Sequence, residues 1–332
     1  MPVEVSIVIP VYNGQSFLEE TISSLWDQTY KEFEIICVDD SSTDNSYDLL
    51  KSLALKDSRL KVYQKENGGT AAKAIIYGLQ FASGNYFMYS SQDDIFSSDL
   101  LEKNVGVAKT LNVDAVVPDM ILYWDNKNSK RGIFGINGDR SRVITGREAV
   151  DLSLDWTIHG FVLWKMETVR SVGFYDFGMN SDEFTTRALY LGSKKVAFSD
   201  GKFYYRQNNT NAITKRWNAN QLDCFDTSHR LETFLLNNGF NEDAIYKVHR
   251  IIFIDLIRLQ LMYLRNKTRM STPDQLMATR GIKSAYYANY PKIKSLHSAS
   301  LKQFLVTKAV SLGYPSFLVY TYLHFWFRKI FK

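Results

Sequence analysis

Short apolar runs alternate with amphipathic segments over the first 90 residues of the chain. Runs typical of buried strands occupy Val5–Val11, Phe33–Val38, Leu60–Gln64 and Tyr86–Tyr89. Apolar residues recur three or four positions apart, as in a helix, over residues 17–26, 47–55 and 70–82. Strands and helices that alternate at this interval predict an α/β fold, with a mainly parallel sheet covered by helices on both faces.

The pattern changes near residue 221 to long helical segments. Residues 244–265 carry a broad apolar face that includes Val248, Ile252 and Leu259. We therefore expect two domains with a boundary near Arg216: an α/β domain over residues 1–216 and a helical domain over residues 217–332. The apolar stretch at 316–327 has 12 residues, fewer than the roughly 20 needed to span a bilayer.

The net charge of +5 conceals an uneven distribution. Residues 241–332 hold 15 Lys and Arg against four acidic residues, a net charge of +11, so the preceding part carries −6. The basic, aromatic tail predicts either docking on an anionic membrane surface or a packing and oligomer interface. No nucleic-acid recognition motif accompanies the positive charge, so we expect no nucleic-acid partner.

Two features favour a cytoplasmic protein, with peripheral attachment to the inner face of the cell membrane as one alternative. Cys37 and Cys224 fit neither a disulfide framework nor a metal-ligand spacing. The apolar run near the start is too short and too β-branched for a signal peptide.

Polar clusters follow the second and fourth predicted strands, where α/β sheets carry their ligand sites. Asp39, Asp40 and Ser41 place several oxygens in one turn, which suits hydrogen bonding to a nucleoside. The alternative is a cap for the following helix, a role that Asp44 can fill.

Asp93 and Asp94 form the second cluster. Adjacent carboxylates repel each other unless a cation neutralises them. Mg²⁺ or Mn²⁺ accepts one or two carboxylates together with diphosphate oxygens, and would stabilise charge on a departing nucleoside diphosphate. A polar turn before the helix that begins near Asp99 is the structural alternative.

A third acidic pair, Asp182 and Glu183, lies at the predicted start of a helix. Such a pair can stabilise the helix dipole. Alternatively, one of the two acids can be the general base that takes the proton from a hydroxyl nucleophile. Farther along, residues 202–216 mix basic and amide side chains, including Arg206. This segment can close over a diphosphate or form a solvated connector.

Taken in order, these motifs resemble the family 2 glycosyltransferases, an inverting group with the GT-A fold, over about residues 3–215. The resemblance lies in residues 8–13 (VIPVYN), 22–28 (ISSLWDQ), 38–44 (VDDSSTD), 66–69 (ENGG), 91–94 (SQDD) and 181–183 (SDE). It implies a GT-A domain with a Rossmann-like, mainly parallel sheet, followed here by a helical C-terminal region.

The resemblance also assigns site residues. Glu183 or Asp182 would be the catalytic base, with Glu183 preferred by position, and Asp93 and Asp94 would bind Mg²⁺ or Mn²⁺. Contacts to the nucleotide-sugar donor would come from Pro10, Tyr12, Asn13, Asp39, Asp40, Ser41, Asn67, Gly69, Lys73, Gln92, Asp94 and Arg206. Three departures from the family pattern are Ser91 in place of an Asp, Ala74 in place of an Asn, and the reversed order of Asp182 and Glu183.

The implied activity is inverting, metal-dependent sugar transfer in surface polysaccharide synthesis. The donor would be a nucleoside-diphosphate sugar, UDP-linked in the simplest case, and the acceptor a hydroxyl of a glycan, wall polymer or lipid-linked molecule. Ser91 and the reversed acid pair leave a non-catalytic nucleotide-sugar-binding partner subunit as the alternative. Nucleotidyl transfer and nicotinamide chemistry are disfavoured because neither a triphosphate loop nor a GxGxxG follows a strand.

Overall fold

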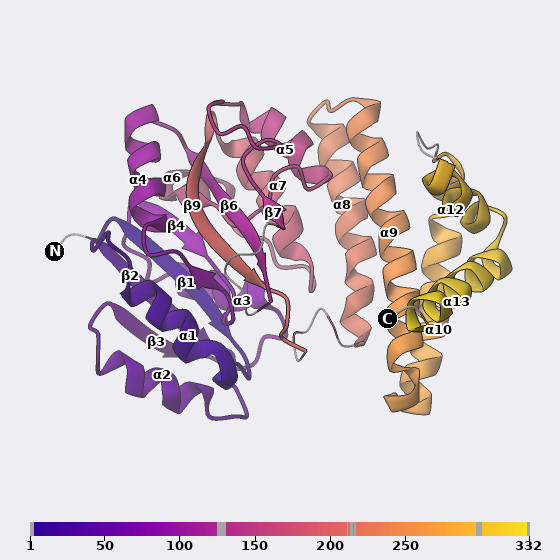
Figure 1. Ribbon diagram of the computed structural model, residues 1–332, viewed down its shortest axis with the longest axis horizontal. Helices are drawn as coiled ribbons and strands as arrows, with labels where there is room; N and C mark the ends of the chain where they lie inside the picture. The colour runs from indigo at the N-terminus through magenta and orange to yellow at the C-terminus, as the bar shows by residue number, and fades with distance from the viewer. Residues whose placement is uncertain are drawn as a thin grey trace. The chain divides into compact units, whose positions relative to one another are not determined.

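The computed structural model describes residues 3–124, 131–210, 212, 215, 217–296 and 301–330. Its contacts divide the chain into two compact units, Met1–Asn209 and Thr210–Lys332. Figure 1 shows the strands in the first unit and long helices in the second. Arg216, near which the sequence places the domain boundary, lies outside the described residues.

The N-terminal half of the sheet is parallel. Strand β1 (Val5–Val11) lies between β2 (Phe33–Asp39) and β4 (Tyr86–Tyr89), and β2 also pairs with β3 (Leu60–Gln64). Helices α1, α2 and α3 connect these strands, and they span Gln15–Trp26, Ser46–Ala54 and Ala71–Leu79. Parallel pairing brings the ends of β1, β2 and β4, and the turns that follow them, to one edge of the sheet.

The second half of the sheet is mixed. Strand β6 (Ala115–Tyr123) pairs in parallel with β9 (Val196–Arg206). Three short strands pair antiparallel with their neighbours: β5 (Ile95–Phe96), β7 (Gly132–Ile133) and β8 (Leu163–Lys165). The sheet order is β3-β2-β1-β4-β8-β6-β9-β5, with β7 beside β6. The expected parallel arrangement therefore holds for the longer strands, and the added antiparallel ones have only two or three residues.

Helices cover this sheet because alternate side chains of its strands point to opposite faces. Ile7 and Ile9 of β1 belong to a buried cluster that includes Leu18 and Ile22 of α1. On α3, a side chain at Gly78 would come within 2.6 Å of Val8, so the missing side chain lets α3 approach the sheet closely. The remaining helices of this unit are α4 (Leu100–Leu111), α5 (Gly146–Leu154), α6 (Met166–Val172) and α7 (Ser181–Gly192).

One buried carboxylate joins several segments at the opposite end of the sheet. Glu34 accepts hydrogen bonds from Ser6 Oγ at 2.6 Å, Lys61 Nζ at 2.5 Å and the backbone N–H of Ser83 at 2.7 Å. Burial disfavours the charged form, but these hydrogen bonds outweigh it and lower the pKa of Glu34. The charged Glu34 thus helps to hold β1, β2 and β3 together.

The second unit is helical. Its elements are η2 (Ala219–Leu222), α8 (Asp223–Asn237), α9 (Glu242–Asn266), η3 (Lys267–Arg269), α10 (Thr272–Ala288), α11 (Tyr290–Lys294), α12 (Leu301–Ser311) and α13 (Tyr314–Ile330). The predicted helix at 244–265 corresponds to α9. Within the described ranges, no helix is both long and apolar enough to cross a membrane.

Candidate donor-binding and catalytic site

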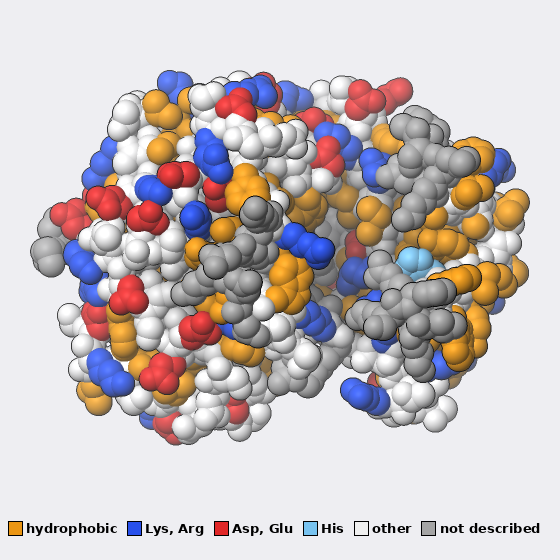
Figure 2. All heavy atoms as spheres, in the orientation of Figure 1, with side chains coloured by type: hydrophobic (Ala, Val, Ile, Leu, Met, Phe, Trp, Pro, Cys, Tyr) orange, Lys and Arg blue, Asp and Glu red, His pale blue; other side chains and the backbone are white. Residues whose placement is uncertain are grey.

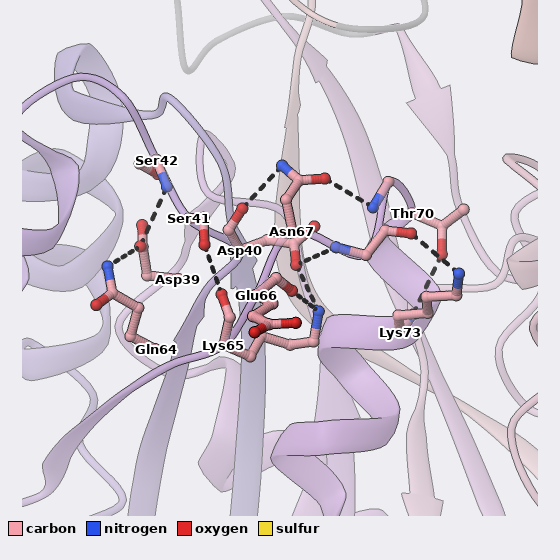
Figure 3. A network of polar contacts seen from close by, with 12 residues as sticks. Asp39, Asp40, Ser41, Ser42, Gln64, Lys65, Glu66, Asn67, Thr70 and Lys73 are labelled. Carbon is pink, nitrogen blue, oxygen red and sulfur yellow. Dashed lines mark hydrogen bonds and ion pairs between the residues drawn. The ribbon is translucent and has the colours of Figure 1, made fainter.

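The end of β2 presents a buried carboxylate oxygen that lacks a partner in the described part of the protein. Asp39 is fully buried, and its Oδ2 accepts hydrogen bonds from the Ser42 N–H at 3.2 Å and from Gln64 Nε2 at 3.0 Å (Figure 3). Its Oδ1 has no hydrogen-bond partner among the described residues. Pro10 lies beside this strand end, paired with Val38 in the register of β1 and β2. A buried acceptor without a donor is costly, so this oxygen is suited to a ligand N–H or O–H.

Asp40 has its partners within the protein. Its Oδ1 accepts from Lys65 Nζ at 2.7 Å and from the Gly68 N–H at 2.8 Å (Figure 3). Ser41 has a left-handed φ of +58° and donates its hydroxyl to the Lys65 carbonyl at 2.8 Å. These contacts hold the loop before α3 against the end of β2, so Asp40 shapes the loop.

Asn67 and Gly69 complete that loop. Asn67 Nδ2 donates to the Asp40 carbonyl at 2.9 Å, while its Oδ1 accepts from the Gly69 N–H at 2.9 Å. Gly69 has a φ of +79°, a conformation that a side chain would strain. Both predicted donor-binding residues therefore determine the course of this loop.

Lys73 lies on the first turn of α3 and meets a residue from a distant loop. Its ammonium donates to the Gly68 carbonyl at 3.1 Å and lies 3.7 Å from the Asp176 carboxylate. Thr70, which caps α3, donates its hydroxyl to Asp176 at 2.9 Å. The Lys73 side chain is about half exposed, at 47%, which leaves room for an anionic ligand.

The turn after β1 is fastened to both neighbouring turns. Asn13 Oδ1 accepts from the Thr43 N–H at 2.7 Å and the Asp44 N–H at 3.2 Å. Gln92 pairs reciprocally with the backbone of Tyr12, accepting at 2.8 Å and donating at 3.0 Å. The predicted donor-binding residues Asn13 and Gln92 thus have protein partners, whereas the Tyr12 side chain is exposed.

The turn after β4 contains another buried carboxylate oxygen without a partner among the described residues. Asp94 is fully buried; its Oδ1 accepts from the Arg206 N–H at 3.0 Å, and its Oδ2 has no hydrogen-bond partner in the described part of the chain. Asp93 Oδ2 accepts from Asn209 Nδ2 at 2.7 Å. Burial, followed by the negative charge of Asp93, raises the pKa of Asp94 well above its usual range.

Arg206, at the end of β9, supports this turn. Its Nε donates to the Asp93 carbonyl at 2.7 Å, and its guanidinium forms an ion pair with Glu20 of α1. The same group lies over the rings of Phe17 and Tyr123, at 4.8 and 5.0 Å. The side chain is only 3% exposed, so its present contacts orient the acidic turn.

The chemistry of Asp93 and Asp94 fits a hard divalent cation. Mg²⁺ is usually bound through one or two carboxylates together with substrate phosphates and water, without a complete protein cage. Across the described residues, no group of three or more His, Cys, Asp or Glu side chains has a metal-binding arrangement. A cation would relieve the unpaired charge at Asp94, so the pair is suited to a metal that the substrate helps to hold.

Asp182 and Glu183 begin α7 and differ in their electrostatic surroundings. Glu183 forms an ion pair with Arg187 one turn later, and Arg187 also donates to the Ser153 carbonyl at 2.8 Å. Burial, and then the charge of Glu183, raises the pKa of Asp182 to about 7. Arg187 therefore neutralises Glu183, while Asp182 has a pKa suited to proton exchange near neutral pH.

Tyr205 shows that the two acidic pairs share one electrostatic environment. Its pKa is raised first by burial and then by the charges of the four carboxylates, namely Asp94, Asp93, Asp182 and Glu183. Burial, and then the charges of Asp182 and Glu183, also raise the pKa of Tyr89. The Tyr89 hydroxyl lies 3.2 Å from that of Thr186. The fold therefore brings together two motifs that are far apart in sequence.

The first unit is therefore an α/β domain of the class that binds ligands at the carboxyl ends of its strands. The family model described as Glycosyl transferase family 2 matches residues 6–161. Glycosyltransferase GlyG of Streptococcus pneumoniae serotype 4 is 30% identical over 214 residues, which cover 61% of this chain and 70% of GlyG. The chain belongs to glycosyltransferase family 2.

Other relatives match over shorter regions. The uncharacterized glycosyltransferase RC0461 of Rickettsia conorii is 40% identical over 131 residues, which cover 39% of this chain and 21% of that protein.

Solved structures of other proteins share the fold. The S. aureus TarS fragment 1-349 in complex with UDP-GlcNAc has a TM-score of 0.65 and 15% identity, with 96% of this chain and 89% of that chain covered. The mannosyltransferase PcManGT from Pyrobaculum calidifontis, in complex with GDP-Man and Mn²⁺, has a TM-score of 0.51 and 15% identity. The match covers 99% of this chain and 88% of PcManGT. The GT-A fold predicted from the sequence motifs is thereby confirmed.

Proposed function

We propose that this glycosyltransferase moves a sugar from a nucleoside-diphosphate sugar, UDP-linked in the simplest case, to a hydroxyl group with inversion at the anomeric carbon. The acceptor would be a glycan, wall polymer or lipid-linked molecule in surface polysaccharide synthesis. One observation carries the proposal: at the ends of the strands that flank β1, Asp39 and Asp94 each bury a carboxylate oxygen that has no partner among the described residues. The complex of the TarS fragment with UDP-GlcNAc supports UDP as the nucleotide.

The donor would lie over the turns that follow β1, β2 and β4. Asp39 would accept a hydrogen bond from the nucleoside, and Lys73 would attract the diphosphate. The other predicted donor-binding residues would contact the donor or fix the loops around it: Pro10, Tyr12, Asn13, Asp40, Ser41, Asn67, Gly69, Gln92 and Arg206.

Asp93 and Asp94 would hold Mg²⁺ or Mn²⁺. When bound, such an ion offsets the negative charge that develops on the departing diphosphate. Asn209 and Arg206 fix the Asp93 side chain and backbone, so that its carboxylate is already oriented. PcManGT, whose solved complex contains Mn²⁺, supports the choice of metal.

Asp182 or Glu183 would act as the base. The acceptor oxygen attacks the anomeric carbon, the bond to the diphosphate oxygen breaks, and the carboxylate takes the hydroxyl proton. Position in the motif favours Glu183. The electrostatics favour Asp182, because Arg187 neutralises Glu183 and because the pKa of Asp182 is raised toward neutrality.

The basic second unit would bring the enzyme to the inner face of the cell membrane, near a lipid-linked acceptor. Its charge and its exposed aromatic side chains support this placement. Assembly of several copies through the same unit is the alternative.

Thermal stabilisation by nucleotides tests the donor site. UDP, GDP and their sugars would be added to the wild type and to Asp93→Ala, each with Mn²⁺ or with EDTA. We expect a metal-dependent shift that Asp93→Ala abolishes. Asp48→Ala, a change at an exposed carboxylate on α2, serves as the control. The absence of a shift with every nucleotide would overturn the proposal, while binding without hydrolysis or transfer would indicate a non-catalytic partner subunit.

A further inference from the structure

An apolar groove in the second unit has no role in the proposed sugar transfer. It lies between α9, α10 and α13, with a volume of about 630 Å³. Its apolar and aromatic walls include Tyr263, Leu264, Leu318, Val319, Tyr322 and Leu323. The volume falls in the range of about 300–1,000 Å³ that is typical of small-molecule sites.

One wall of this groove continues as an exposed apolar face of α13. Val319, Tyr322, Leu323 and Trp326 are spaced three or four residues apart, so they share one side of the helix, and each is 43–59% exposed. The opposite side packs inward through Phe317, which is fully buried. Figure 2 shows hydrophobic side chains gathered over α13. Contiguous exposed apolar surface of this kind marks an interaction site.

Two cations line the same groove. Arg280 and Lys283 lie three residues apart on α10, so both side chains project from one face of that helix. Both are exposed, and neither forms an ion pair with an acidic side chain in the described ranges. An apolar groove lined by unpaired cations matches an anionic head group joined to a hydrocarbon chain.

We propose that this groove takes one acyl chain of an anionic phospholipid from the membrane surface. Arg280 and Lys283 bind the head-group phosphate, and the exposed face of α13 enters the interfacial layer. Tyr322 and Trp326 suit that layer because their rings combine an apolar body with a polar edge. The net charge of +11 over residues 241–332 draws the unit to an anionic leaflet. The groove thus gives the membrane docking suggested above a specific lipid site.

Vesicle sedimentation of the full chain tests the proposal without a sugar donor, so its result is independent of transferase activity. Vesicles of phosphatidylcholine alone would be compared with equimolar phosphatidylcholine and phosphatidylglycerol, and we expect binding to the mixture only. The double change Arg280→Gln/Lys283→Gln should weaken binding more than about tenfold. Val319→Asp and Leu323→Asp, both at exposed positions, should abolish it.

A matched double variant separates a lipid site from general attraction. Arg250→Gln/Lys294→Gln removes the same charge from exposed positions that do not line the groove. If this variant weakens vesicle binding as much as Arg280→Gln/Lys283→Gln does, the proposal is overturned. A wild-type protein that does not bind anionic vesicles would also overturn it. The same holds if Val319→Asp and Leu323→Asp both bind normally. Concentration-dependent dimers that Leu323→Asp abolishes would assign the groove to a second copy and also overturn it.

A short-chain lipid tests occupation of the groove directly. Monomeric dihexanoyl-phosphatidylglycerol, below its micelle concentration, should bind the wild type in calorimetry. Leu318→Trp keeps the wall apolar but narrows the groove, and it should weaken this binding. Equal binding by wild type and Leu318→Trp would show that the acyl chain lies elsewhere. Circular dichroism and melting temperatures would confirm that each variant is folded.

Discussion

The acidic turn after β4 predicts a conflict between stability and function at Asp94. In the unfolded chain this carboxyl is ionised in water at neutral pH. The folded chain must either bury an unpaired charge or take up a proton, as the raised pKa of Asp94 indicates. Both routes disfavour the folded state. The change Asp94→Asn should therefore stabilise the metal-free protein.

The expected gain follows from the hydrogen bonds of this side chain. Asparagine keeps an acceptor for the Arg206 N–H and removes the buried negative charge, while its Nδ2 amide group takes the place of the unpartnered Oδ2. Removal of a buried charge that lacks a partner contributes about 1–3 kcal/mol. Each kcal/mol raises the melting temperature by about 2–4 °C in a domain of roughly 150–250 residues. We expect a rise of at least about 2 °C by this reasoning.

Differential scanning fluorimetry in EDTA, repeated with Mn²⁺ and the nucleotide that stabilises the wild type, measures both effects. Asp94→Asn should melt higher than the wild type in EDTA and lose the metal-dependent shift. Asp40→Asn is the matched control, because this buried carboxylate already accepts from Lys65 and the Gly68 N–H. It should lower the melting temperature. If Asp94→Asn melts at or below the wild-type temperature in EDTA, the reasoning from the unpaired buried charge is refuted.

Four further changes test other parts of the molecule. Glu34→Gln should lower the free energy of unfolding, measured with urea, by about 2–3 kcal/mol. The pKa of Glu34 is lowered in the folded protein, so this loss of stability should be present above the unfolded pKa of about 4.3. It should disappear as the pH falls through the folded pKa of Glu34. Asp182→Asn should reduce kcat by roughly 10²–10⁴-fold. Glu183→Gln removes a neighbouring negative charge, so it should lower the pKa of Asp182 and move the acidic limb of the pH–rate profile to lower pH. An acidic limb that does not move would contradict this coupling between Asp182 and Glu183. Asn209→Ala should raise the Mn²⁺ concentration for half-maximal activity about tenfold, and unchanged metal titration would exclude a role in holding Asp93.

The sequence predicted the N-terminal strands well because each carries a local signal. The expected bounds of β1, β3 and β4 agree with the structure, and β2 extends one residue farther, to Asp39. Strands β5, β7 and β8 have only two or three residues, too few to show a period, and they pair with partners far along the chain. Their antiparallel pairing depends on tertiary structure.

The acidic clusters of the site were also found from sequence, but their partners were not. The unpartnered oxygens of Asp39 and Asp94 belong to predicted residues. Tyr205 and Asn209 were seen only as members of a polar segment, because their proximity to the acids depends on how β9 lies in the sheet. Asp176, which contacts Lys73, had no local signal at all. Whether the predicted residues bind donor, metal and proton stays a prediction.

The pairing of Gln92 with Tyr12 affects how mutational data at this site should be interpreted. The Gln92 amide presents an N–H and a C=O to the Tyr12 backbone, as a peptide group on a neighbouring strand would, so the pair links the ends of β1 and β4 as an additional strand pairing does. Replacing Gln92 would let the two turns separate and would weaken donor binding even if no atom of Gln92 touches the donor. A loss of activity at this position is therefore no proof of contact. A second change that reconnects the turns and restores activity would identify the residue as part of the scaffold.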